Sequence, residues 1–286
     1  MEILDLFKKK VTNTDVAKIK KKPDSETPTQ AEDDEKIDIK TAEMVLEMMK
    51  RETIKPVLRI TLTDTKALIT GSKVGGLPYL PADADIPLDS NGMPLRMLAQ
   101  IDCHELLAMA DFPHNGLLQF WIGQDDSSGL FTDGDNRVIW YDTVDENITE
   151  DDVRSRLEAL SQPDDEYFPV KGEYGIILTV DNEPMPLADS HFSPMFIAKF
   201  NEITTRKPIE SMNDLGDDIN EMIWDSIVSA GHKISGYPFF TQWDPREEND
   251  DRTILLLQLD SEYLGGNEKI MWGDAGVCGF FALLTN

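Results

Sequence analysis

Alternating and continuous apolar stretches predict a series of β-strands in this chain. Residues 58–63 alternate between aliphatic and polar side chains, as in a strand with one buried face. Residues 117–122 are apolar at nearly every position, which indicates a strand buried on both faces. Further strands are predicted at 94–101, 137–141 and 170–180. Strands therefore account for much of the expected core.

Helical spacing of apolar residues predicts helices before and between these strands. In a helix over 40–52 we interpret the apolar stripe as core. That stripe consists of Met44, Val45, Met48 and Met49. Thr149 caps a helix predicted over 150–161, because the carboxylates that follow it suit the positive end of the helix dipole. A further helix is predicted over 208–230, with Leu215-Gly216 as a point where it can be interrupted and Gly231 at its C-terminal end.

One stretch of the chain occurs twice. Residues 72–79, Ser-Lys-Val-Gly-Gly-Leu-Pro-Tyr, are similar to residues 232–239, His-Lys-Ile-Ser-Gly-Tyr-Pro-Phe. Each copy is followed by a strand that ends in Gln, an aliphatic residue and Asp, and then by a glycine that opens an aromatic strand. Equivalent residues keep nearly constant separations: Gly76 and Gly236 are 160 residues apart, Gln100 and Gln258 are 158 apart, and Gly116 and Gly276 are 160 apart. This period is too long for a solenoid and predicts an internal duplication.

We therefore expect an α+β fold in which two related β-rich halves, about 55–145 and 168–286, pack with flanking helices. The two repeats would form a single domain over 37–286. Residues 1–36 are expected to be a disordered or weakly helical extension, because residues 23–36 form an acidic linker without large apolar side chains.

The chain is strongly acidic. Its 286 residues include 54 acidic and 27 basic ones, which gives a formal net charge of −27. Such a surface repels nucleic acid and anionic membranes, so we expect neither as a partner. The charge either serves solubility or forms a docking surface for a basic protein partner. No apolar run approaches the length of about 18 residues that a transmembrane helix needs.

The cysteines and the N-terminus indicate the compartment. Cys103 and Cys278 both lie in predicted core segments, and neither belongs to a Cys-x-x-Cys pair. We expect buried free thiols, with neither a disulfide framework nor a metal site. Residues 1–10 place lysines after a short apolar patch, the reverse of the order in a signal peptide. These features predict a cytoplasmic protein.

Four residues in or after the repeated motif are candidates for function. Gly76 belongs to a Gly-Gly-x-Pro step that lacks the features of a P-loop, so a tight turn is favoured over a phosphate site. Asp102 and Asp260 occupy equivalent positions, where a carboxylate either binds a ligand or caps the following segment, and we favour capping. His232 stands where the first copy has Ser72, and either interacts with a helix dipole or acts as a base or ligand.

A second group of candidates lies near the C-terminus. Trp272 and Asp274 occupy a glycine-rich turn, and with His232, Tyr237 and Trp243 they are residue types that line ligand pockets. The same types also fill protein cores. No nucleophile elbow, zinc-protease motif or kinase signature is present in the sequence, so no catalytic residue is assigned and no cofactor is predicted.

In combination, several motifs resemble the YwqG-like family, a bacterial family defined by a domain of unknown function (DUF1963). The resemblance covers roughly 40–286 and rests on the runs 75–78, 94–102, 232–238, 256–260 and 272–276. It implies a cytoplasmic α+β domain with no established activity and no catalytic residues to carry over. Some members look to be encoded near secreted-toxin systems, which implies an immunity or accessory role. The long N-terminal extension departs from the family pattern.

Two functions fit these observations. The first is a non-enzymatic binding or accessory protein, including a toxin-immunity role, that uses its acidic surface or the cleft between the repeats. The alternative is a small-molecule-binding protein or an enzyme with a cleft around His232, Trp243 and residues 272–274. Convergence of those side chains in the fold would favour the alternative.

Overall fold

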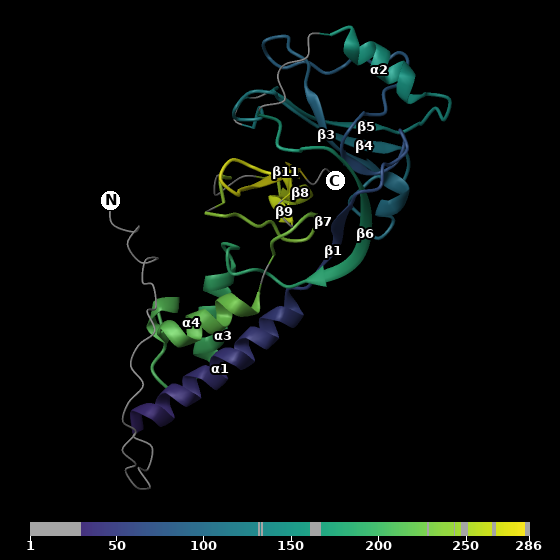
Figure 1. The fold of residues 1–286 in the computed structure, drawn as a ribbon. Coiled ribbons are helices and arrows are strands. Elements are labelled where there is room, and N and C mark those ends of the chain that lie inside the picture. The colour runs from purple at the N-terminus through teal and green to yellow at the C-terminus, as the bar shows by residue number, and fades with distance from the viewer. Residues whose placement is uncertain are drawn as a thin grey trace, which may run out of the picture.

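One large β-sheet and a separate group of helices make up the chain in a computed structural model (Figure 1). The structure describes residues 30–130, 132, 134–160, 167–227, 229–242, 244–246, 251–264 and 267–283, with side chains from Ile39 onward. The architecture is a strand-rich α+β fold, in agreement with the class that the sequence predicts.

The main sheet has nine antiparallel strands in the order β11-β8-β7-β1-β6-β2-β3-β4-β5. Their bounds are β1 Lys55–Thr63, β2 Lys73–Gly75, β3 Arg96–Asp102, β4 Leu117–Ile122, β5 Asn136–Tyr141, β6 Glu173–Glu183, β7 Lys233–Ser235, β8 Ile254–Asp260 and β11 Val277–Ala282. A separate hairpin consists of β9 (Glu262–Leu264) and β10 (Asn267–Ile270).

The centre of the sheet is the pair β1 and β6. These strands align from Lys55 opposite Glu183 to Thr63 opposite Gly175. On one side of the pair lie β7, β8 and β11, and on the other lie β2, β3, β4 and β5. The strands of the repeated motif, β2 and β7, therefore occupy matching places beside the central pair. The predicted alternation in β1 is confirmed, since its aliphatic residues are buried.

The sheet curls so that strands far apart in its order face each other. The Phe120 ring on β4 lies 5.1 Å from the Phe280 ring on β11 in an edge-on arrangement, although six strands separate β4 from β11 in the order. Strands on both sides of the central pair contribute residues to the apolar core on the concave face. Edge-on aromatic contacts of this kind help to hold the curl closed.

A layer of helices lies below the sheet in Figure 1 and consists of α1 (Gln30–Glu52), α3 (Phe192–Ile203) and α4 (Asp217–Ser226). Its core contains three phenylalanines one turn apart on α3, with successive ring centroids 6.0 and 6.1 Å apart. Side chains at this spacing share one helix face. The remaining helix, α2 (Glu150–Glu158), lies on the other side of the molecule, above β5 in Figure 1.

Helix α1 differs from its prediction in length and in its buried face. It begins ten residues earlier than predicted, within the expected linker, while residues 1–29 of the extension lie outside the described residues. Val45 and Met49 are buried, but Met44 and Met48 are 48% and 36% exposed, so the methionine stripe is only partly core. The buried face is rotated toward Leu46, because α3 and α4 pack on that side of α1.

The other helices follow local signals more closely. Thr149 forms the predicted cap: its side chain accepts a hydrogen bond from the Asp152 N–H, and the Asp152 carboxylate accepts one from the Thr149 N–H. The helix predicted over 208–230 is interrupted, because Gly216 at φ 82° separates the 3₁₀ turn η3 (Met212–Leu215) from α4. Helix α3 lies in a segment for which the sequence pattern predicts no element.

Both cysteines are buried free thiols, as predicted. Burial is the main cause that raises the pKa of Cys103 and that of Cys278 to about 12. Thiols with so high a pKa stay protonated and unreactive near neutral pH. Within the described residues, no helix combines the length and the apolar character needed to cross a membrane.

Candidate functional site

Each copy of the repeated motif is held in place by hydrogen bonds from one buried glutamine. Gln100 accepts a hydrogen bond from the Tyr79 N–H at 2.8 Å and donates to the carbonyls of the loop before β2. Gln258 accepts one from the Phe239 N–H at 2.8 Å and donates to the carbonyls of the loop before β7. Each glutamine thus satisfies backbone groups on both sides of a motif strand, and this role is structural.

Each motif turn faces a carboxylate. Gly76 and Gly236 have φ angles of 73° and 77°, in the left-handed region that suits glycine. A Cβ at Gly76 would overlap the Glu173 carboxylate, and one at Gly236 would overlap that of Glu183. The backbone at Gly76 agrees with the tight turn that the sequence predicts.

A buried ion cluster lies behind the second turn. Lys233 Nζ donates to Glu183 at 2.8 Å, Arg59 donates to the same carboxylate at 2.6 Å, and the Tyr237 N–H donates to it at 2.6 Å. The Lys233 and Glu183 side chains are 0% and 2% exposed. Burial lowers the pKa of Lys233 to about 8, while Glu183 opposes that effect. Sequence reasoning missed this cluster, because its members come from three strands that only the topology brings together.

Among the described residues, the lysine of the first copy has no matching ion pair. Lys73 is fully buried, and its ammonium donates to the carbonyl of Leu68 at 3.0 Å, a neutral acceptor. Burial lowers the pKa of Lys73 to about 8 as well. The two motif lysines therefore have similar burial but different partners.

His232 uses both ring nitrogens within the protein. Nδ1 accepts a hydrogen bond from the Asp260 N–H at 2.9 Å, so the ring proton resides on Nε2, which donates to Glu262 at 2.9 Å. Glu262 also lies 3.5 Å from Lys269. The His232 side chain is 7% exposed. In this arrangement neither nitrogen is available to a substrate.

Asp102 acts as a cap, whereas Asp260 accepts hydrogen bonds from two backbone groups near the ends of β7 and β8. Asp102 accepts a hydrogen bond from the His104 N–H at 3.0 Å, at the start of the 3₁₀ turn η1 (Cys103–Leu106). Asp260 accepts hydrogen bonds from the Gly231 N–H at 2.9 Å and the Ser261 N–H at 2.8 Å. The contact of Asp102 agrees with the capping interpretation, and that of Asp260 joins the loop before β7 to the end of β8.

The remaining predicted site residues are divided between different parts of the fold. Tyr237 belongs to the core of the helix layer and donates its hydroxyl to the Thr53 carbonyl at 2.7 Å. Trp272 belongs to the core of the concave face, whereas Asp274 is exposed in a turn. Trp243 lies outside the described residues. The structure brings His232 and Asp260 into contact but separates Tyr237 from Trp272, and a binding role for these residues stays a prediction.

Strand β5 carries exposed apolar side chains at the edge of the sheet. Val138 lies opposite Phe120 of β4, and Trp140 lies opposite Leu118. Phe120 and Leu118 are 0% and 6% exposed, whereas Val138 and Trp140 are 40% and 50% exposed. The apolar face of the sheet therefore continues one strand beyond the core. We call Val138 and Trp140 the β5 ledge.

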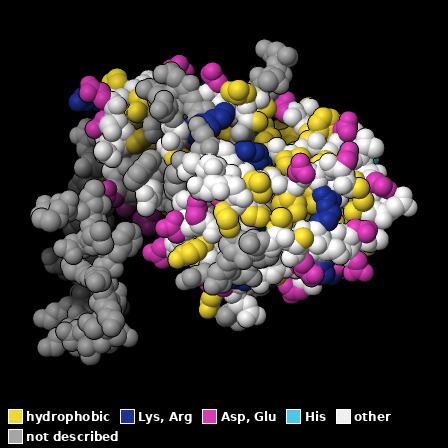
Figure 2. All heavy atoms as spheres, turned by 90° about the horizontal axis from the view of Figure 1, so that it is seen from above, with side chains coloured by type: hydrophobic (Ala, Val, Ile, Leu, Met, Phe, Trp, Pro, Cys, Tyr) yellow, Lys and Arg dark blue, Asp and Glu magenta, His cyan; other side chains and the backbone are white. Residues whose placement is uncertain are grey.

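Acidic residues precede and follow β5 in the sequence. Residues 123–152, which run from the end of β4 into α2, contain ten acidic residues and one basic residue, Arg137. Backbone hydrogen bonds lower the pKa of Asp125 and Asp145, and a hydrogen bond from Lys66 lowers that of Glu150, so these groups are ionised at neutral pH. In the view from above, acidic side chains lie scattered around hydrophobic ones, with a few lysine and arginine side chains among them (Figure 2).

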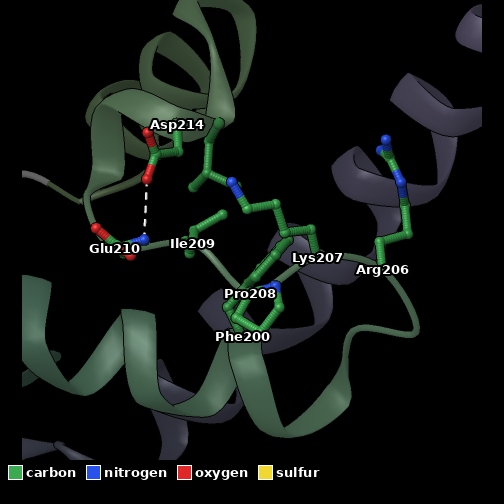
Figure 3. A pocket seen from close by; sticks show the side chains of 8 residues that line it. Phe200, Arg206, Lys207, Pro208, Ile209, Glu210 and Asp214 are labelled. Carbon is green, nitrogen blue, oxygen red and sulfur yellow. Dashed lines mark hydrogen bonds between the residues drawn. The ribbon is translucent and has the colours of Figure 1, made fainter.

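Two of the hollows on the described part of the surface lie away from β5. One, of about 380 Å³, lies between α3 and η3, and Figure 3 shows Lys207 extending across it above Pro208 while Arg206 points away. Asp214 at its rim accepts a hydrogen bond from the Glu210 N–H at 2.9 Å. The other, of about 320 Å³, lies beside the central strands and is lined by Thr63, Thr65, Lys66, Ala67, Ser72, Gly175, Ile176 and Ile177. In the part of the chain that the structure describes, no cluster of three or more His, Cys, Asp or Glu side chains is arranged to hold a metal ion.

Comparisons with known proteins give the family and nothing more specific. No curated protein matches the chain. The model of the family described as a domain of unknown function (DUF1963) matches residues 72–283, from the first motif copy to the end of β11. Because this match spans well over half of the chain, the protein belongs to the DUF1963 family.

Proposed function

We propose that this protein is a non-enzymatic binding protein that engages a basic protein partner through the acidic face around β5. The observation that carries the proposal is the concentration of charge in the sequence of residues 123–152, where ten acidic residues and one basic residue accompany the exposed apolar positions of β5. Charge on this scale attracts and orients a cationic partner, and apolar contact then adds affinity. A toxin domain neutralised by an immunity protein is one kind of basic partner with this chemistry.

The geometry of the predicted cleft favours binding over catalysis. Both nitrogens of His232 have partners, and its side chain is 7% exposed. A general base must reach the proton that it abstracts, and this ring has no free acceptor. The two buried thiols suit a reducing compartment, and we place the protein in the cytoplasm on that basis.

We also infer that the fold arose by duplication. In this view β1, β2, β3 and β4 correspond to β6, β7, β8 and β11, and each long central strand pairs with the motif strand of the other half. The equivalent contacts of Gln100 and Gln258 support this origin. Superposing the two sets of strands in an experimental structure tests it, and glutamines that fail to coincide would contradict it.

A salt titration tests the proposed function. The probe is a nine-residue peptide of alternating lysine and valine, with an alternating glutamate and valine peptide as its control. Between about 0.01 M and about 1 M salt the screening length falls from about 30 Å to about 3 Å. We expect the lysine peptide to bind at low salt and to weaken steeply with added salt, and the glutamate peptide not to bind. Failure of the lysine peptide to bind at low salt would refute the proposal.

A further inference from the structure

We propose that β5 accepts an extended segment of the basic partner as an additional strand of the sheet. In this arrangement, alternate apolar side chains of the segment pack on the β5 ledge. The cations between them project from the opposite face, within the field of the exposed carboxylates that flank β5 in the sequence. The inference rests on the proposed function and specifies how the partner binds.

The first argument is the state of the sheet edge. Strand β5 is the last strand in the order and pairs with β4 in an unbroken register over its six residues. Half of the N–H and C=O groups of an edge strand point away from its neighbour and are available to another strand. Proteins commonly protect such edges with lysine, proline or a bulge. The sequence of β5, Asn-Arg-Val-Ile-Trp-Tyr, contains one charged residue, Arg137, and neither lysine nor proline.

The opposite edge of the same sheet provides a contrast. Strand β11 has a register shift between Phe280 and Phe281 in its pairing with β8. Gly279, which lies next to this shift, further weakens the strand as a template. An irregularity of this kind discourages pairing at an edge. The regular edge at β5 is therefore the better acceptor of the two.

The second argument is the apolar face that β5 leaves uncovered. Trp140 donates its indole N–H to the Asn115 carbonyl at 2.9 Å, which fixes the ring while leaving half of it exposed. A strand added beside β5 would place every second side chain next to Val138 and Trp140, because paired residues lie on one face of a sheet. The incoming segment would thereby extend the concave core by one strand.

The third argument concerns the occupant. A second copy of this chain would bring another net charge of −27 to the same edge, and like charges oppose that approach. A basic segment instead gains from the exposed carboxylates that flank β5 in the sequence, among them Asp125, Asp142 and Glu146. Strand addition needs about five or six residues in extended form, with apolar and cationic side chains alternating.

The experiment compares two protein variants and two peptides on the full chain. Val138→Lys introduces a cation at the β5 ledge, and Val180→Lys is the matched control at another exposed valine, 62% exposed on β6. The probe is the alternating lysine and valine peptide, and its control carries methyl groups on alternate backbone nitrogens. Affinity and amide hydrogen exchange of residues 136–141 are both measured.

We expect Val138→Lys to weaken binding about tenfold or more while Val180→Lys has little effect, and we expect the unmethylated peptide alone to slow exchange in β5. Binding without protection of β5, or equal effects of the two substitutions, would overturn strand addition while leaving the salt-dependent proposed function intact. Protection of β5 in a dimer without peptide would identify a second copy as the occupant. Binding that appears only after removal of residues 1–22 would identify the chain's own N-terminal segment. Either result would overturn the assignment to a partner.

Discussion

The ammonium of Lys233 lies 2.8 Å from the carboxylate of Glu183, and both side chains are almost completely removed from solvent. The two residues are fifty positions apart, on β7 and at the end of β6. The same carboxylate receives Arg59 and the Tyr237 N–H, so it joins the sheet to the second motif turn. The contact is structural, and its removal gives the first prediction.

Replacing Glu183 should destabilise the protein strongly. Glu183→Gln keeps the shape of the side chain but leaves the buried ammonium of Lys233 without its counter-charge. Breaking a buried pair in this way costs about 3–5 kcal/mol. We expect a decrease of that size in the free energy of unfolding, measured in urea at neutral pH. A variant as stable as the natural chain would show that the pair contributes little.

The two motif lysines should respond differently to removal of their charge. Lys233→Met leaves Glu183 deprived of one cation and should be clearly destabilising. Lys73→Met removes an ammonium that contacts the neutral Leu68 carbonyl. The free energy of unfolding of this variant should therefore stay within about 1 kcal/mol of that of the natural chain, or increase. Equal losses in the two variants, measured by the same urea titration, would contradict this difference.

Stability should rise between about pH 8 and pH 9. Burial lowers the pKa of Lys73 and Lys233 to about 8 in the folded state, against an ordinary value of 10.5 for an exposed lysine. Above pH 8 the unfolded chain therefore binds more protons than the folded chain, and the free energy of unfolding increases with pH. Between pH 8 and pH 9 the two lysines together should add about 2 kcal/mol to the free energy of unfolding.

The rise should level off above pH 9. Cys103 and Cys278 have pKa values of about 12 when folded, against 9.0 when unperturbed, so unfolding releases protons from them in this range and stability decreases with pH. Urea titrations from pH 7 to pH 10 measure the sum of the two effects. A flat or falling curve between pH 8 and pH 9 would show that the lysines are not desolvated as described.

The motif turn should not tolerate a side chain at Gly236. Gly236→Ala places a Cβ in the left-handed region and against the Glu183 carboxylate. The control is Gly92→Ala, which has a similar φ of 80° but nothing within 4 Å of the added Cβ. We expect a loss of about 1 kcal/mol for the control and a larger loss for Gly236→Ala. Thermal unfolding compares the two, and equal losses would exclude a collision with the carboxylate.

Local signals in the sequence predicted local structure well. The alternation over 58–63 gave β1, and Thr149 with its carboxylates gave the start of α2, because both signals depend on neighbouring residues. Met44 and Met48 were assigned to the core wrongly, since helical spacing allows several faces and only the packing of α3 selects one. Helix α3 escaped prediction because the prolines at 184, 186 and 194 obscure its phenylalanine stripe.

The candidate site was less accessible from sequence. Val138 and Trp140 are exposed because β5 is the last strand of the sheet. The hydrophobic pattern of the sequence does not predict the order of the strands. The acidity of residues 123–152 is visible in the sequence, but its relation to an edge strand is not. His232 was predicted either to interact with a helix dipole or to act as a base or ligand, and its contacts with Asp260 and Glu262 come from the fold.

The most direct measurement of the central claim is the affinity of the lysine and valine peptide for two charge variants of the full chain. One variant combines Asp142→Asn with Glu146→Gln, which neutralises two exposed carboxylates just after β5. The other combines Glu43→Gln with Glu221→Gln, which removes the same charge from exposed positions in the helix layer. We predict that the first pair weakens binding and reduces its salt dependence, while the second pair has little effect. Equal affinities for the two variants would contradict a binding face centred on β5.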